Sequence, residues 1–192
     1  MTKFVNIHTH RPTGSAIEPV AVGIHPWDAA ERSVAEIENL IVGADAVGEI
    51  GLDSVCKVDF ERQIEVFDEQ LTLAEQFDKP VIIHCVRTFE QVIKLLSKHK
   101  LKAVIFHGFI GSPEQAKRAI ERGYFLSFGE HSFASPRTVA ALEKMPLESI
   151  FLETDDDPVT IDDTYAKAAV IKRVRMSELE TKILENYNKI FR

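Results

Sequence analysis

The amino-acid sequence predicts an α/β fold, a TIM-like β/α barrel with seven parallel strands and with helices outside. Short β-branched or aromatic runs, apolar on both faces, are typical of buried parallel strands. These runs cover residues 4–7, 20–24, 44–47, 80–83, 103–106, 124–128 and 149–152. Helix-length amphipathic stretches separate the runs, and this alternation predicts a parallel sheet covered by helices.

Helix signals lie in the stretches between the runs. Asp28 is placed to cap a helix whose inner face is Val34, Ile37 and Ile41. Apolar residues spaced by three and four predict a longer helix over residues 60–74. Four further helix starts carry a capping pattern: Thr88 with Gln91, Ser112-Pro113, Ser135-Pro136 and Ser177 with Glu180.

Two architectures fit this alternation, a closed barrel and an open doubly wound sheet. The first crossover, after His10, has about a dozen residues, which is near the minimum length for a connection between parallel strands. This length does not distinguish the closed barrel from the open sheet. Seven runs rather than eight predict a barrel that lacks one βα unit or closes irregularly. The length of 192 residues and the lack of a linker composition predict a single domain over residues 1–192.

The composition excludes several classes of protein. A net charge of -7 lacks the basic footprint of proteins that coat duplex DNA, although metal ions can neutralise phosphate locally. Two cysteines, Cys56 and Cys85, do not make a disulfide framework. No signal-peptide pattern and no apolar run of membrane-spanning length is present. We therefore expect a cytoplasmic monomer that does not associate with membranes.

Polar residues follow the apolar runs, at the predicted strand ends. Five of the seven histidines stand there, namely His8, His10, His25, His84 and His107. The carboxylates at these ends are Glu49, Asp53, Glu153 and Asp155. Because the carboxyl ends of parallel strands build the active site in barrels and open sheets alike, we expect these side chains to converge.

This pattern predicts a metal centre. His8 and His10 are two residues apart in an extended segment, so both imidazoles point to one side and can reach one ion. Imidazole and carboxylate ligands suit Zn, Mn, Fe or Mg, and the set suits two divalent ions. Glu49 is the natural bridge between them, and Asp155 can bind one ion and accept a proton from the attacking water. The alternative, buried polar residues without a metal, would be costly.

Six segments in this order resemble the TatD family of metal-dependent deoxyribonucleases, within the amidohydrolase-like barrels. They are Ile7-His8-Thr9-His10, Gly23-Ile24-His25-Pro26, Val47-Gly48-Glu49-Ile50-Gly51-Leu52-Asp53, Lys79-Pro80-Val81-Ile82-Ile83-His84, Phe106-His107-Gly108-Phe109 and Leu152-Glu153-Thr154-Asp155. The resemblance spans nearly the whole chain. It implies a TIM-like barrel and phosphodiester hydrolysis, with exonuclease action on DNA ends in some members.

The resemblance also implies the roles of individual residues. The metal ligands fall on His8, His10, Glu49, His84, His107 and Asp155. Arg87 matches a family arginine that can contact phosphate. His25, apart from the resemblance, has two interpretations: it binds substrate or supports a metal ligand, or it is a structural residue beside Pro26-Trp27. Around the ligands we expect Asp53 to orient a neighbour and Glu153 to hydrogen-bond. Trp27 is interpreted as a lid or packing aromatic rather than a base-stacking platform.

Some positions depart from the family pattern. Asn6 stands where the family usually has Asp, which is expected to alter how the first histidine is oriented. Gly108-Phe109-Ile110 replaces Cys-Phe-Ser, so a substrate-side polar group is missing. The chain is also short between His10 and Gly23, and Asp156 and Asp157 add two carboxylates in a turn. These departures affect the expected identity of the substrate more than the expected metal ligands.

Three functions remain open at this point. The first is a two-metal phosphodiesterase, a deoxyribonuclease acting on DNA ends, including 3′ ends, through metal-bound hydroxide. The second is hydrolysis of a non-phosphate amide or ester bond on the same scaffold, which the acidic charge and the missing polar group favour. The third is a catalytically inactive metal-binding module, against which the intact ligand set argues.

Overall fold

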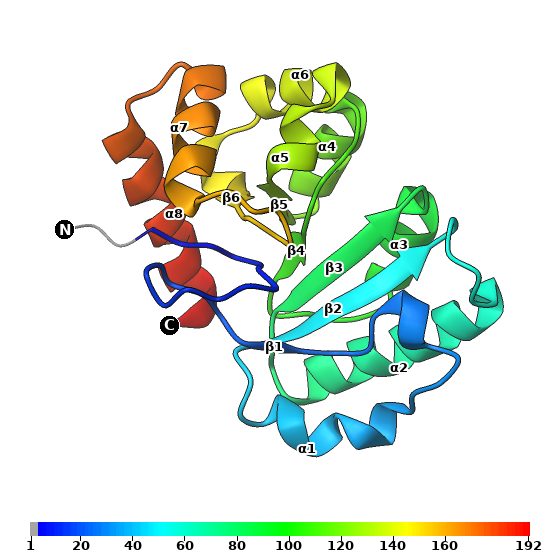
Figure 1. The fold of residues 1–192 in the computed structure, drawn as a ribbon. Coiled ribbons are helices and arrows are strands. Elements are labelled where there is room, and N and C mark those ends of the chain that lie inside the picture. Colours follow the sequence, from blue (N-terminus) through cyan, green and yellow to red (C-terminus); the bar gives the residue numbers. More distant parts are fainter. Residues whose placement is uncertain (1–3) are drawn as a thin grey trace. The chain divides into compact units, whose positions relative to one another are not determined.

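The computed structural model describes residues 4–192, which form two compact units (Figure 1). Unit 1 consists of the chain up to Pro19 together with His107–Arg192, and unit 2 is Val20–Phe106. The predicted parallel α/β architecture is confirmed, with six strands in residues 4–192 rather than seven. The expectation of a single domain over residues 1–192 stays a prediction.

The strands of unit 2 are parallel and follow one another in chain order. They are β1 (Ala21–Val22), β2 (Ala46–Asp53), β3 (Val81–Val86) and β4 (Val104–Phe106). Strand β2 pairs with β1 and β3, and its register against β3 shifts between Val47 and Ile50. Strand β3 also pairs with β4. Beyond this shift, Ile50 lies opposite Ile83 and Gly51 lies opposite His84.

The helices of unit 2 match the prediction in part. They are η1 (Pro26–Asp28), η2 (Val34–Glu36), α1 (Glu38–Ile41), α2 (Phe60–Gln76) and α3 (Phe89–Leu96). The helix capped by Asp28 was a wrong prediction, because Asp28 ends η1 and Ser33 instead forms a capping box with Glu36. The inner face of Val34, Ile37 and Ile41 is nevertheless buried as expected.

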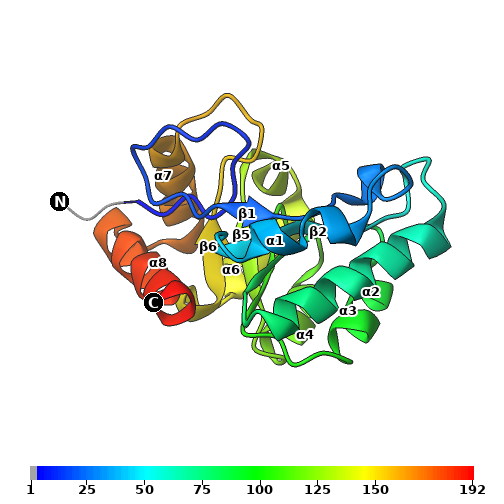
Figure 2. The ribbon, with the colours of Figure 1, turned by 90° about the horizontal axis from the view of Figure 1, so that it is seen from below.

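Helices α2 and α3 pack on the strands of unit 2. Helix α2 is capped by the Asp59 side chain and lies along β2, burying Val66, Phe67 and Leu71 (Figure 1, Figure 2). Thr88 is the N-cap of α3, but the predicted capping box does not form. Its hydroxyl donates instead to the backbone carbonyl of Leu52, which ties the start of α3 to β2.

Unit 1 contains two paired strands and all the remaining helices of residues 4–192. They are β5 (Phe125–Phe128), β6 (Ile150–Leu152), α4 (Pro113–Ile120), α5 (Glu130–Phe133), α6 (Pro136–Lys144), η3 (Leu147–Ser149), α7 (Ile161–Lys172) and α8 (Met176–Phe191). The side chains of Ser112 and Ser135 cap α4 and α6 as predicted. The start of α8 at Ser177 was wrong, because Arg175 is the N-cap and Ser177 lies in the first turn.

The predicted first strand, residues 4–7, is not a regular strand and forms one isolated bridge, between Val5 and Ile17. The backbone N–H of Asn6 donates to Ile17, and the N–H of Ile7 donates to Leu152 of β6 at 3.1 Å. Beyond it, the N–H of Asp155 donates to His8 and the N–H of His10 donates to Asp155. These hydrogen bonds align the segment that carries both histidines with the end of β6.

Tyr165 of α7 anchors the same segment. Its side chain is fully buried, and its hydroxyl accepts the Val5 N–H at 3.2 Å and donates to the Val5 carbonyl at 3.1 Å. Burial raises the pKa of the phenol well above its ordinary value, so the hydroxyl stays neutral and can donate.

The substitution Tyr165→Phe tests this anchor. It leaves a buried donor and a buried acceptor of Val5 without their partner, so the free energy of unfolding should fall by about 1–3 kcal/mol. Urea denaturation followed by circular dichroism measures the change. An unchanged midpoint would show that the hydroxyl does not hold the segment.

No helix within the described part of the chain is both long enough and apolar enough to span a membrane.

Candidate metal centre

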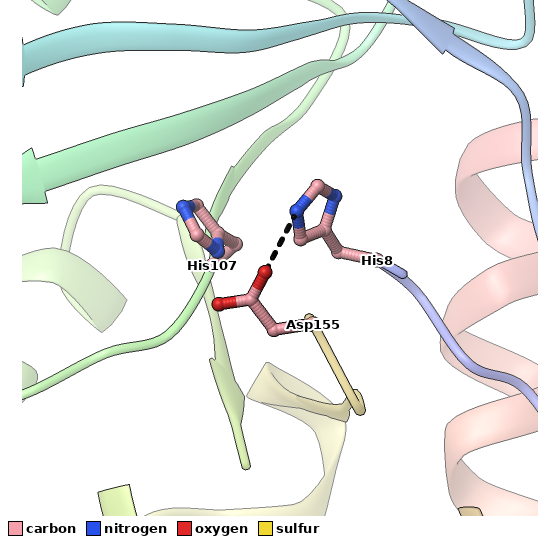
Figure 3. A group of neighbouring side chains, drawn as sticks. All are labelled: His8, His107 and Asp155. Carbon is pink, nitrogen blue, oxygen red and sulfur yellow. Dashed lines mark ion pairs between the residues drawn. The ribbon is translucent and has the colours of Figure 1, made fainter. Parts of the chain in front are cut away.

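In unit 1, the side chains of His8, His107 and Asp155 face one another (Figure 3). One potential ligand atom from each lies within 4.8 Å of the other two. The Nε2 atom of His8 is 3.5 Å from Asp155 Oδ1, and the rings of His8 and His107 have centroids 4.5 Å apart. The Nε2 atom of the more exposed His10 lies 3.4 Å from the same oxygen. Three imidazoles thus surround one carboxylate.

Backbone geometry places Asp155 in this group. Its φ of 51° lies in the left-handed region, which is uncommon for a residue other than glycine. Such conformations persist where surrounding contacts fix them, and they gather at functional sites. Asn6 supplies two of these contacts, because its side chain accepts the Thr154 N–H at 3.0 Å and donates to the Thr154 hydroxyl at 2.9 Å. Asn6 therefore holds the residue before Asp155.

Glu153 lies behind His107. It is 1% exposed, and its Oε1 atom accepts the Gly108 N–H at 2.7 Å and lies 3.4 Å from His107 Nδ1. A carboxylate on the second ring nitrogen is the usual partner of a metal-binding histidine, because it fixes the tautomer and orientation of the ring. Gly108 has a φ of +49°, and this turn points its N–H at the carboxylate.

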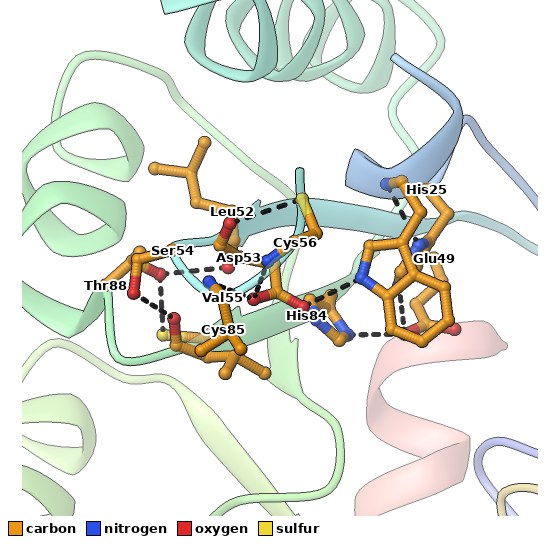
Figure 4. A network of polar contacts seen from close by, with 12 residues as sticks. His25, Glu49, Leu52, Asp53, Ser54, Val55, Cys56, His84, Cys85 and Thr88 are labelled. Carbon is orange, nitrogen blue, oxygen red and sulfur yellow. Dashed lines mark hydrogen bonds and ion pairs between the residues drawn. The ribbon is translucent and has the colours of Figure 1, made fainter. Parts of the chain in front are cut away.

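Unit 2 carries a second group made of His25, Glu49 and His84 (Figure 4). The Oε1 atom of Glu49 lies 2.8 Å from His84 Nδ1 and 3.4 Å from His25 Nε2. The two imidazole rings have centroids 4.4 Å apart in an edge-to-face arrangement. Glu49 and His84 come from neighbouring strands, and His25 caps η1 in the segment that follows β1. The structure thus brings His25 among the potential ligands.

Asp53, at the end of β2, links this group to its surroundings. Its Oδ2 atom lies 3.3 Å from His84 Nε2 and accepts the indole N–H of Trp27 at 2.8 Å. Burial acts to raise the pKa of Asp53, but the hydrogen bonds from Trp27, Val55 and His84 outweigh it and hold the pKa below its ordinary value. The ionised carboxylate can therefore orient His84, the task that we expected of Asp53.

The approach of β2 to β3 at His84 requires glycine at position 51. Gly51 has a φ of +148°, and a Cβ atom there would lie 1.9 Å from the His84 carbonyl oxygen. The two strands therefore meet more closely than any side chain at this position allows.

The substitution Gly51→Ala should destabilise the fold severely. Both the strained φ and the clash with backbone oppose it, so the free energy of unfolding should fall by at least about 3 kcal/mol. Gly43→Ala is the matched control, because its Cβ would come no closer than 3.9 Å to a neighbouring atom. Equal thermal midpoints for the two variants would contradict the close approach.

Other predicted residues lie at more open positions. Arg87 is exposed directly after β3 and has a φ of 56°. Asp156 and Asp157 lie in the turn after Asp155, where they form a further group with His131 of α5. His131 is largely exposed, and its Nε2 atom is 3.8 Å from Asp157 Oδ1. Trp27 is 60% exposed, which argues against a place in the core, and its interpretation as a lid stays a prediction.

The donors of the two main groups fit a divalent metal ion. Each group offers imidazole nitrogen and carboxylate oxygen, the ligand types that Zn and Mn accept and that Mg shares in part. In each group the ligand atoms already lie within 4.8 Å of one another. Buried or half-buried imidazoles around a shared carboxylate therefore suit an ion better than they suit a solvated surface.

Comparisons with known proteins agree with this fold. Residues 16–192 match the family described as TatD related DNase. The uncharacterized metal-dependent hydrolase YjjV of Escherichia coli (strain K12) is 39% identical over 147 residues, which are 70% of this chain and 56% of that protein. The 3′-5′ ssDNA/RNA exonuclease TatD of Citrobacter rodentium is 29% identical over 145 residues, which are 69% of this chain and 55% of that protein.

A solved structure of YjjV, a TatD homologue from Escherichia coli K12, has a TM-score of 0.81 to this chain at 32% identity. The match covers 91% of this chain and 76% of that one. The chain belongs to the TatD-related DNase family. It spans little more than half the length of the two curated relatives compared above.

Proposed function

We propose that the chain is a divalent-metal-dependent hydrolase of phosphodiester bonds, a deoxyribonuclease that acts on DNA ends. The observation that carries this proposal is the presence of two groups in which imidazoles surround a carboxylate. The family match and the nuclease name of the Citrobacter relative support the choice of bond.

Two divalent ions are proposed, and Mg, Mn and Zn all suit the donors. His8, His10, His107 and Asp155 are the proposed ligands from unit 1, and Glu49 and His84 are the proposed ligands from unit 2. His25 becomes a further candidate ligand because it lies 3.4 Å from Glu49 Oε1. That Glu49 bridges the two ions stays a prediction.

Metal ions in such a site polarise the phosphoryl oxygen and lower the pKa of water. The side chains of the chain supply the remaining steps. Asp155 accepts the proton from the attacking water, and Glu153 holds the His107 ring through its Nδ1 atom, 3.4 Å away. Asp53 does the same for His84. Arg87, exposed after β3, contacts the phosphate of the substrate.

A second candidate function is hydrolysis of a non-phosphate amide or ester bond. Ile110 stands where the family has a serine, and its side chain is 54% exposed. An exposed apolar side chain in place of a hydroxyl favours a less polar substrate than DNA.

We place the protein in the cytoplasm and expect it to be a monomer.

The test uses short single-stranded DNA labelled at its 5′ end and incubated with the chain and Mn²⁺ or Mg²⁺. We expect stepwise shortening from the 3′ end that stops when EDTA is added. DNA that stays intact although the protein has bound the metal ion would contradict the nuclease proposal. A panel of amide and ester substrates would then test the second candidate function.

A further inference from the structure

Trp27 and Val55 expose apolar surface beside the histidine–carboxylate group of unit 2. Both side chains are 60% exposed, and Trp27 is the single tryptophan in the sequence. The Trp27 ring lies edge-to-face with His25, with centroids 4.8 Å apart, and its centroid is 6.5 Å from that of His84. A large aromatic face is thus open to solvent next to two potential metal ligands.

One buried carboxylate fixes this surface. Asp53 Oδ2 accepts the indole N–H of Trp27, and Asp53 Oδ1 accepts the Val55 backbone N–H, each at 2.8 Å. The Trp27 backbone N–H also donates to His25 Nδ1 at 3.2 Å. Hydrogen bonds from the backbone N–H and from the indole N–H therefore fix the Trp27 residue, although most of its side chain is exposed. A ring fixed in this way loses little conformational entropy when a ligand packs on it.

The same carboxylate connects the aromatic surface to the metal-binding group. Asp53 Oδ2 lies 3.3 Å from His84 Nε2, and His84 Nδ1 lies 2.8 Å from Glu49. His84 and Glu49 would hold a divalent ion, and a substrate phosphate bound to that ion would bring the adjoining nucleoside close to the Trp27 ring. Every nucleobase has a π-face, so stacking on tryptophan tolerates any sequence, as action on DNA ends requires.

We propose that Trp27 is a stacking platform for a nucleobase at the end of the DNA substrate, with Val55 extending its apolar edge. The inference rests on the proposed function, because it names the part of that substrate which the unit 2 site recognises. It makes Trp27 a substrate-binding residue that contacts a base of any identity and takes no part in proton transfer.

The single tryptophan provides a direct readout that does not depend on cleavage. The full chain is titrated in Ca²⁺ with a short oligothymidylate while its tryptophan fluorescence is recorded. A parallel titration uses an abasic chain of the same length, which keeps the phosphates and lacks the bases. We expect saturable quenching by the oligothymidylate and little quenching by the abasic chain.

Variants separate stacking from general binding. Trp27→Ala should weaken binding of a labelled oligothymidylate about tenfold, measured by fluorescence anisotropy. Trp27→Phe keeps an aromatic face and should recover most of that loss. Leu40→Ala removes another exposed apolar side chain of unit 2, 57% exposed, and should bind as the wild type does.

Cleavage of the same oligonucleotide in Mn²⁺ distinguishes failure of this inference from failure of the proposed function. Cleavage with no base-dependent quenching, and with equal KM for wild type and Trp27→Ala, overturns the platform and leaves the nuclease in place. Base-dependent quenching without cleavage supports base stacking on Trp27 and overturns the proposed nuclease activity. The absence of both overturns both.

Discussion

The substitution Asp155→Asn should lower the rate of DNA cleavage by about a thousandfold. The variant keeps the shape of the side chain but removes the negative charge that faces His8 at 3.5 Å and His10 at 3.4 Å. It also removes the proposed acceptor for the proton of the attacking water. Initial rates on 5′-labelled single-stranded DNA at saturating Mn²⁺ measure the effect.

Asp157→Asn is the matched control for this prediction. Asp157 lies two residues further along the same turn, and its contact is with the largely exposed His131 at 3.8 Å. The control should keep nearly the full rate. If both variants cleaved DNA at the wild-type rate, Asp155 would have no place in the reaction.

Glu49→Gln should lower the rate by at least about a hundredfold. Glu49 Oε1 lies between His84 Nδ1 at 2.8 Å and His25 Nε2 at 3.4 Å, so the amide would replace the carboxylate that these two histidines share. The rate should recover only in part when the Mn²⁺ concentration is raised, because a neutral amide is a weaker ligand than a carboxylate.

A second histidine–glutamate contact in unit 2 supplies the control. Glu75 Oε2 lies 3.4 Å from His99 Nδ1, and neither residue stands at a predicted strand end. Glu75→Gln should leave the cleavage rate unchanged. A similar loss of rate in both variants would mean that the effect comes from general destabilisation of unit 2.

Much of the fold could be predicted because the strand signal is local. Runs that are apolar on both faces overlap β1 to β6, and polar residues follow each run within two residues. The first run fails as a regular strand because its backbone–backbone hydrogen bonds join it to Ile17 and Leu152 individually rather than to a paired strand. Those partners are distant in sequence or lie in a loop, so periodicity does not reveal them.

Helix capping was predicted less well where the capping side chain forms a hydrogen bond with a residue far away in the sequence. The Thr88 hydroxyl has the spacing of a capping box, yet it donates to the Leu52 carbonyl. Helix α7 was missed because its apolar residues do not fall on one clear face. Its Thr160 cap, whose hydroxyl accepts the Asp163 N–H, was the available signal.

The candidate site could be predicted as a set of residues but not as two groups. Strand-end position identified the histidines and carboxylates, because parallel strands align their carboxyl ends. It could not place His25 among the potential ligands, since His25 follows a two-residue strand and caps a 3₁₀ helix. Nor could it show that Asp53 binds both His84 and Trp27, which depends on side-chain geometry.

The most direct test of the central claim is a titration of the metal-free chain with Mn²⁺, followed by isothermal calorimetry. The wild type should bind two ions, and Asp155→Asn and Glu49→Gln should each bind fewer than two or bind at least about tenfold more weakly. Two ions bound by both variants with wild-type affinity, or none bound by the wild type, would contradict the assignment of these groups as a metal centre.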